Sequence, residues 1–193
     1  MKKITVVGSP GAGKSRLARK LGSIFHIRVY HLDRIFWLPG WGKKSRDTRI
    51  DILQNLVQER QWIIDGTYLN TSILHLETAD TIIFLGISPF VCLWRIMKRH
   101  LEYDGRSRRD IPMGSTDKLT LFLIWKVLGF PFQSRRTLHQ KLRNCHSKLI
   151  IWLHTPKEVD DFLAQLEPQS EKERQFSKKL SFAGKRHLTA ASR

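Results

Sequence analysis

The feature that constrains this chain most is a glycine-rich segment near its beginning, Gly8-Ser9-Pro10-Gly11-Ala12-Gly13-Lys14-Ser15. Residues 3–7, just before it, are mostly apolar and β-branched, which predicts a buried strand. Residues 16–21, just after it, are good helix formers with apolar side chains at helical spacing. A glycine loop between a strand and a helix, ending in Gly-Lys-Ser, is typical of a phosphate-binding loop, or P-loop.

The chemistry of such a loop is specific. Glycines let the backbone turn several N–H groups toward one anion, and the start of the helix adds the positive end of its dipole. The segment, together with Arg16 after it, therefore predicts an ATP site. In that site Lys14 would reach the β- and γ-phosphates, and the Ser15 hydroxyl would bind Mg²⁺.

Length and composition narrow the class of protein. A chain of 193 residues predicts one domain with ample core. Its two cysteines, Cys92 and Cys145, are far apart and form neither a disulfide framework nor a metal spacing, so we expect a reducing, cytoplasmic setting. We expect no signal peptide, because the P-loop occupies the place of a cleavage site. We also expect no membrane span, because no apolar run reaches roughly 18 residues.

Short apolar runs alternate with helical patterns along the chain. The predicted strands are 3–7, 27–33, 61–66, 80–85 and 148–153. This alternation predicts an α/β fold with a five-stranded parallel sheet and helices on both faces. Helices are expected over 47–60, 70–77, 117–128, 134–145 and from Pro156, and another begins at Pro89. For that helix we expect a core face of Phe90, Trp94, Met97 and Leu101.

Two aspartates follow predicted strands. Asp33 ends the second strand and Asp65 the third, and active groups of parallel sheets gather at the carboxyl ends of strands. Asp65 fits a Walker-B-like carboxylate that holds Mg²⁺ through water. For Asp33 a role as a helix cap or turn residue stays open beside a role in the site.

Two segments of unusual composition could contribute to a site. Residues 34–46 contain Phe36, Trp37 and Trp41, whose rings either stack on a base or aromatic substrate or pack the loop onto the core. Residues 102–115 contain Arg106, Arg108 and Arg109, which either close over phosphates or form a solvated basic loop or nucleic-acid patch.

The charge of the chain indicates an anionic partner. Its net charge is +17 and its pI about 10.4, which suits a nucleotide, a nucleic acid or a membrane surface. The segment 168–193 is basic and poor in apolar residues, so we expect a domain over 1–167 followed by a disordered or loosely helical tail.

Four motifs together resemble a known family. They are the P-loop, the segment His31-Leu32-Asp33-Arg34-Ile35-Phe36-Trp37 with Pro39-Gly40-Trp41, the segment Trp62-Ile63-Ile64-Asp65-Gly66-Thr67-Tyr68, and Gly105-Arg106-Ser107-Arg108-Arg109-Asp110. Over about residues 1–166 the chain resembles small P-loop kinases of the adenylate-kinase type, and more closely the DNA topology modulation protein family.

The resemblance carries further expectations. It implies the strand order 2-3-1-4-5 and an ATP-dependent phosphotransferase site. It implies that Asp33 lies on the acceptor side, that Asp65 holds the Walker-B place, and that the lid arginines cover the phosphates. It also implies that Arg95 and Arg99 face the acceptor. The chain departs from many such kinases at Gly86, where they have an acidic residue after the fourth strand.

The sequence thus predicts an ATP- and Mg²⁺-dependent kinase that transfers the γ-phosphoryl group to an unidentified small molecule. Asp33 would orient the acceptor and take its proton. The alternative from another class is a nucleic-acid-binding regulator that affects DNA topology and uses ATP as a switch. A third possibility is a degenerate kinase fold that binds nucleotide without transferring a phosphoryl group.

Overall fold

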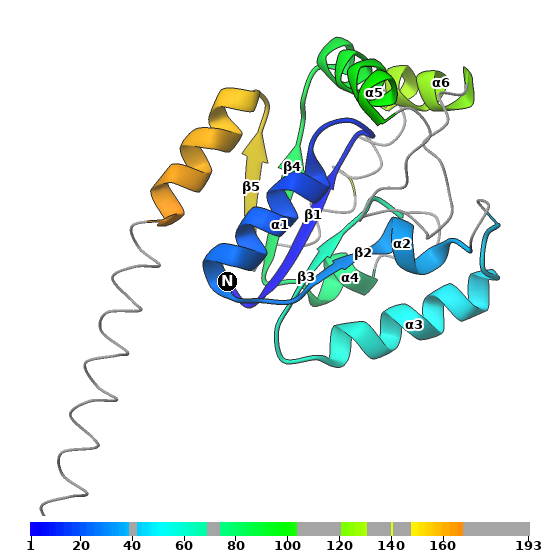
Figure 1. Cartoon of the computed structure of the whole chain (residues 1–193). Helices are drawn as coiled ribbons and strands as arrows, with labels where there is room; N and C mark the ends of the chain where they lie inside the picture. Colours follow the sequence, from blue (N-terminus) through cyan, green and yellow to red (C-terminus); the bar gives the residue numbers. More distant parts are fainter. Residues whose placement is uncertain (39–41, 69–73, 104–120, 131–139, 141–147, 168–193) are drawn as a thin grey trace, which may run out of the picture.

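The computed structural model describes residues 1–38, 42–68, 74–103, 121–130, 140 and 148–167. Within them, five strands form one parallel sheet in the order β2-β3-β1-β4-β5, which confirms the predicted fold class and strand order (Figure 1). The strands are β1 Lys3–Gly8, β2 Val29–His31, β3 Trp62–Asp65, β4 Thr81–Leu85 and β5 Leu149–Leu153. The P-loop therefore leaves the central strand.

Helices connect these strands, as the alternating pattern predicted. They are α1 Lys14–Phe25, α2 Leu32–Phe36, α3 Arg46–Gln58, α4 Leu74–Thr78, α5 Pro89–Tyr103, α6 Leu121–Gly129 and a last helix over 156–167. Of the helix expected over 134–145, all but residue 140 lies outside the described residues. No helix in the described part of the chain is long and apolar enough to span a bilayer.

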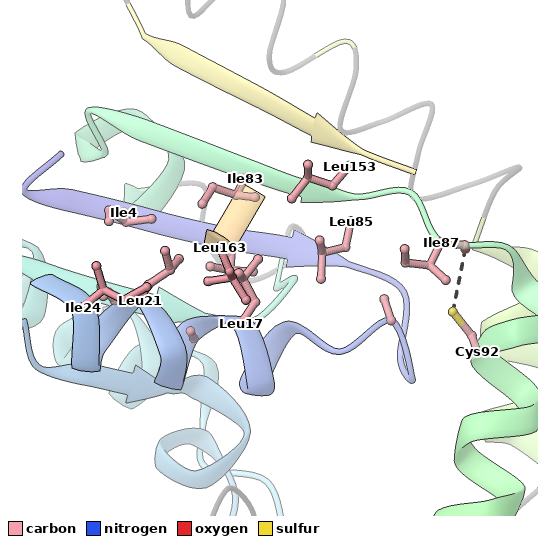
Figure 2. Close-up of a cluster of buried hydrophobic side chains, with 14 of the residues drawn as sticks. Ile4, Leu17, Leu21, Ile24, Ile83, Leu85, Ile87, Cys92, Leu153 and Leu163 are labelled. Carbon is pink, nitrogen blue, oxygen red and sulfur yellow. Dashed lines mark hydrogen bonds between the residues drawn. The ribbon is translucent and has the colours of Figure 1, made fainter. Parts of the chain in front are cut away.

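Strands β1, β3 and β4 are buried on both faces, because successive side chains point to opposite sides of the sheet and helices pack on each side. One face carries Ile4, Ile83 and Leu153, which pack with Leu17 and Leu21 of α1 and Leu163 of the last helix (Figure 2). The other face carries Val7, Ile64 and Phe84, which pack with residues of α2, α3 and α4.

Helix starts follow their local signals. The Ser45 hydroxyl accepts a hydrogen bond from the Thr48 N–H at 3.1 Å and caps α3. The Thr155 hydroxyl accepts one from the Glu158 N–H at 3.1 Å, and the Glu158 carboxylate accepts one from the His154 N–H at 2.9 Å. These hydrogen bonds cap the last helix as predicted from its Thr-Pro start.

The predicted core face of α5 is wrong. Phe90, Trp94, Met97 and Leu101 are exposed, whereas Cys92 and Ile96 are fully buried against the core. The sequence of α5 carries apolar residues on two sides, and helical periodicity alone cannot tell which side faces the sheet. The smaller residues face inward because the P-loop packs closely on this helix.

The second strand is shorter than predicted. It ends at His31, and Asp33 lies in the first turn of the short helix α2 instead of at the end of a strand. Acidic groups are favourable there because the helix N-terminus is positive. Beyond α2, an antiparallel bridge pairs Trp37 with Lys43, so the segment expected to be a loop begins as a helix and has paired backbone on both sides of residues 39–41.

Candidate active site

The P-loop adopts a conformation that requires its glycines. Gly11 has φ +79° and Gly13 φ +98°, in the left-handed region that other residues adopt only at a cost. A Cβ on Gly11 would lie 2.5 Å from the Cys92 carbonyl oxygen of α5. The Ala12 N–H donates to the Ser9 carbonyl at 3.2 Å and tightens the turn, after which α1 begins at Lys14. The loop thus presents the N-terminus of α1 at the carboxyl edge of the sheet.

Two cations lie on the P-loop itself. The Lys14 ammonium donates to the Ser9 carbonyl at 3.0 Å, so the lysine folds back over the loop. From α5, the Arg95 guanidinium donates to the Ala12 carbonyl at 3.3 Å. Arg99, one turn further along α5, is half-buried. The structure therefore brings Arg95 to the phosphate loop. The resemblance of the sequence motifs had implied that Arg95 faces the acceptor.

Thr67, which sequence reasoning did not select, fixes the entrance of the P-loop. Its hydroxyl accepts a hydrogen bond from the Gly8 N–H at 2.9 Å and donates one to the Gly8 carbonyl at 3.0 Å. Thr67 follows β3 by two residues, so this contact ties the end of β3 to the end of β1. Its only signal in the sequence is its place two residues after Asp65.

Asp65 ends β3 beside the P-loop strand, opposite Val6 in register. Its side chain is buried, and one carboxylate oxygen, Oδ2, lies 2.8 Å from Nδ1 of His31 at the end of β2. The other oxygen, Oδ1, is buried with no hydrogen-bond partner in the described structure. A buried carboxylate oxygen without a partner is costly unless another group binds it, so this position fits a water or ion ligand.

This arrangement fits Mg²⁺ as nucleotide enzymes use it. In the part of the chain that the structure describes, no group of three acidic, histidine or cysteine side chains forms a complete metal site. Mg²⁺ is usually held by one or two protein oxygens, with phosphates and waters as its remaining ligands. Ser15 at the start of α1 and the Asp65 carboxylate could supply those protein oxygens, the latter through water.

A second carboxylate, Asp33 in the first turn of α2, belongs to a chain of polar contacts among residues that follow β2 and β3. Asp33 is exposed and accepts a short hydrogen bond from the Tyr68 hydroxyl, which in turn accepts one from the Trp37 indole N–H at 2.7 Å. Burial raises the pKa of Tyr68 above its ordinary value, and the negative charge of Asp33 raises it further. Tyr68 therefore remains a neutral hydrogen-bond donor that holds the Asp33 carboxylate in place.

The rings of the predicted aromatic loop divide between two roles. Phe36 is completely buried in the core and meets the Tyr68 ring edge-to-face, with centroids 5.0 Å apart. Of the two predicted roles, Phe36 therefore has that of packing the segment onto the core. Trp37 is only half-buried, and the Lys43 ammonium lies 4.9 Å above its ring. Trp41 lies outside the described residues.

Basic side chains also surround this edge. Desolvation lowers the pKa of Lys126 of α6, although much of that side chain is exposed. The charge of Asp33 opposes this shift, while repulsion from Lys14 and Lys43 adds to it. Lysines that repel one another beside a P-loop favour a bound anion, because an anion would relieve the repulsion. Sequence reasoning missed Lys43 and Lys126 because nothing local marks them.

The departure at Gly86 has a steric cause. Gly86 follows β4, and a Cβ there would lie 2.7 Å from Nδ1 of His154, which follows β5. An acidic side chain at this position would collide with that imidazole unless one of the two moved. The edge therefore carries its carboxylates on the β2 and β3 side, at Asp33 and Asp65.

Other predicted residues lie outside the described structure. These include the three lid arginines, Arg106, Arg108 and Arg109, and the tail 168–193. The nucleic-acid alternative depends on that tail and on the net charge of the chain, so the described site neither supports nor weakens it.

Solved structures share this architecture. A shikimate kinase from Acinetobacter baumannii, in complex with shikimate, matches with a TM-score of 0.51 and 14% sequence identity, over 93% of this chain and 94% of that chain. A deoxyadenosine kinase from M. mycoides, with dCMP and dCDP bound, matches with a TM-score of 0.45 and 14% identity, over 86% of this chain and 98% of that chain. No protein-family model matches the chain, and no curated protein matches it in sequence.

The fold is that of the P-loop kinases. The sheet order and the likeness to the shikimate kinase establish this class of fold. At 14% sequence identity, such a likeness shows the fold and does not indicate the substrate. Membership of the DNA topology modulation protein family remains a prediction from the sequence motifs.

The contact between Gly11 and α5 gives a first prediction. Gly11→Ala should lower the free energy of unfolding by roughly 1–3 kcal/mol, because a left-handed alanine is strained and its Cβ meets the Cys92 carbonyl. It should also weaken ATP binding. Gly129→Ala is the matched control, since a Cβ there meets nothing within 4 Å. Urea unfolding and ATP titration measure both effects, and equal behaviour of the two variants would contradict the described loop.

The state of Tyr68 gives a second prediction. Its pKa is raised in the folded protein, so the unfolded chain releases this proton first as the pH rises through roughly 10. Stability should therefore be constant below that pH and fall above it, and Tyr68→Phe should reduce the fall. Urea unfolding from neutral to alkaline pH tests this. A folded-state titration in which Tyr68→Phe removes phenolate absorbance near pH 10 would refute it.

Proposed function

We propose that this protein is an ATP-dependent small-molecule kinase. The observation that carries the proposal is the arrangement at one sheet edge, where a P-loop with Lys14 lies beside two carboxylates in different settings. Asp65 is buried with one unpartnered oxygen, and Asp33 is exposed and held by Tyr68. A buried carboxylate suits an ion beside the phosphates, and an exposed one suits a substrate that enters from solvent.

Each residue then has a defined task. The backbone N–H groups of residues 8–16 and the Lys14 ammonium bind the β- and γ-phosphates of ATP. Ser15 and Asp65 would hold Mg²⁺, which supplies positive charge to the phosphates. Arg95, already on the P-loop, adds a guanidinium near the γ-phosphate. Arg99, Arg106, Arg108 and Arg109 are proposed to complete the basic surround.

The transfer step follows from the position of Asp33. An acceptor hydroxyl or phosphate binds against the exposed Asp33 carboxylate, with the half-buried Trp37 ring and Trp41 as further proposed contacts. As the acceptor oxygen forms its bond to the γ-phosphorus, the bond from that phosphorus to the β–γ bridging oxygen breaks. Asp33 accepts the proton of an acceptor hydroxyl, and ADP leaves with the electron pair of the broken bond. Tyr68 keeps the Asp33 carboxylate oriented during this step.

Removal of Lys14 tests the kinase proposal. Wild-type protein and ATP are incubated with a panel of nucleosides, nucleoside monophosphates and hydroxylated metabolites, and products are read by mass spectrometry. Lys14→Ala should reduce product formation by on the order of 10²–10³-fold, because it removes a cation that stabilises the transferring group. Lys20→Ala, an exposed lysine of the same helix, should retain activity. Normal turnover by a folded Lys14→Ala protein would reject the mechanism.

A second variant tests the acceptor side. Asp33→Asn keeps the shape of the side chain and its ability to accept from Tyr68, but it cannot take a proton. We expect kcat to fall on the order of 10²–10⁴-fold with little change in ATP affinity. Asp51→Asn, at an exposed position on α3, is the control. Equal kcat values for Asp33→Asn and wild type would remove Asp33 from the proton transfer.

A further inference from the structure

The outer side of α5 carries large apolar side chains that the described core does not cover. Phe90 is 78% exposed, Trp94 65%, Met97 48% and Leu101 79%. The inner side of the same helix is buried, because Cys92 and Ile96 pack against the P-loop at Gly11. Large exposed apolar patches on a folded domain mark interaction sites. We call these four residues the α5 stripe.

The spacing of the α5 stripe is that of a helix-pairing seam. Its members follow one another at intervals of four, three and four residues, which is the alternation of a and d positions in a coiled coil. This pattern reads the same from either end of the helix. If two copies pair antiparallel around a twofold axis between Trp94 and Met97, Phe90 meets Leu101 of the other copy and Trp94 meets Met97. The stripe is therefore complementary to itself.

Helix α6 extends the apolar area. It packs beside α5 (Figure 1). Trp125 and Leu128 of α6 are also exposed. An aromatic side chain carries roughly 150–250 Å² of surface. The four α5 residues with these two thus expose on the order of 800 Å², which is about what one partner contributes to a standard stable interface. An interface that includes both helices would therefore reach the size of a stable dimer interface.

We propose that α5 and α6 form the interface of a homodimer, in which the α5 stripes of two copies pack antiparallel across a twofold axis. The interface lies on the opposite side of α5 from the P-loop, so this proposal does not rest on the proposed kinase function.

The charges of α5 favour a second copy of the chain, and not a membrane surface, as the partner of the α5 stripe. A helix that lies on an anionic bilayer has basic residues free on its polar face. Here the Arg95 guanidinium is bound to the Ala12 carbonyl of the P-loop. Arg99, half-buried, lies on the inward half of the helix too. Beside the stripe lies Lys98, whose ammonium is 3.8 Å from the Glu102 carboxylate. The border of the stripe therefore has both signs of charge, which suits a second copy.

The mass of the full chain in solution tests the proposal. Light scattering at several protein concentrations, in moderate salt, should give twice the 22.6 kDa of one chain. Trp94→Glu should give the single-chain mass with an unchanged circular dichroism spectrum, because two buried carboxylates would face an apolar partner. Ala164→Glu places the same charge on the exposed side of the last helix and should remain dimeric. A monomeric wild type, or a dimer that Trp94→Glu leaves intact, would overturn the proposal.

Cross-linking tests the arrangement even if Trp94→Glu fails to fold. In a Cys145→Ser background, a Phe90→Cys/Leu101→Cys variant should form disulfide-linked dimers on mild oxidation. Within one helix these positions are roughly 16 Å apart along the axis, so they cannot join to each other. Ala164→Cys in the same background should remain monomeric on a denaturing gel. Absence of linked dimers from the double variant would overturn the antiparallel pairing, as would binding of monomeric wild type to anionic vesicles through Trp94.

Discussion

The parallel register of the five strands fixes where chemistry can occur in this protein. Hydrogen bonding places Asp65 opposite both Val6 and His31, and it places Leu85 opposite Gly8 and Leu153. Every strand therefore ends at the same edge, and the residues that follow the strands meet there. With both faces of the sheet covered by helices, this edge is where the ends of all five strands and polar groups from distant parts of the sequence come together.

At that edge, both carboxylates and the start of the P-loop are held by neighbours from other segments. The His31 imidazole lies against one oxygen of Asp65, Thr67 holds the backbone of Gly8, and Tyr68 holds Asp33. All three contacts involve residues 65–68, at the end of β3 and directly after it. A short segment after one strand thus aligns the phosphate loop, the buried carboxylate and the exposed carboxylate. Preorganisation of this kind reduces the rearrangement needed when substrates bind.

Much of the fold and part of the site could be predicted from the sequence. The P-loop, its lysine and the carboxylate after β3 are local patterns, because a strand, a loop and a helix follow one another within a few residues. The sheet order followed from a resemblance of motifs. Tyr68 and Lys126 could not be selected this way, since their relation to Asp33 exists only after the chain has folded.

Two predictions failed for a related reason. The orientation of α5 depends on which of its two apolar sides fits under Gly11, and only the close contact with Cys92 and Ile96 decides that. The end of β2 depends on whether Leu32 continues the strand or turns into a helix. Leu32 is buried and packs closely on Gly66. A Cβ added to Gly66 would lie 2.9 Å from the Leu32 Cβ, and this tertiary contact accompanies the turn. Periodicity in a single sequence contains neither contact.

The two-sided packing of α5 has a thermodynamic consequence. One helix, about 10 Å across, has the phosphate loop on its inner side and the apolar stripe on its outer side. A shift of α5 on nucleotide binding would move its inner and outer faces together. By linkage, if nucleotide binding changes the affinity of the outer face for its occupant, that occupant changes nucleotide affinity by the same factor. If that occupant is a second copy of the chain, such a coupling would make nucleotide affinity depend on protein concentration.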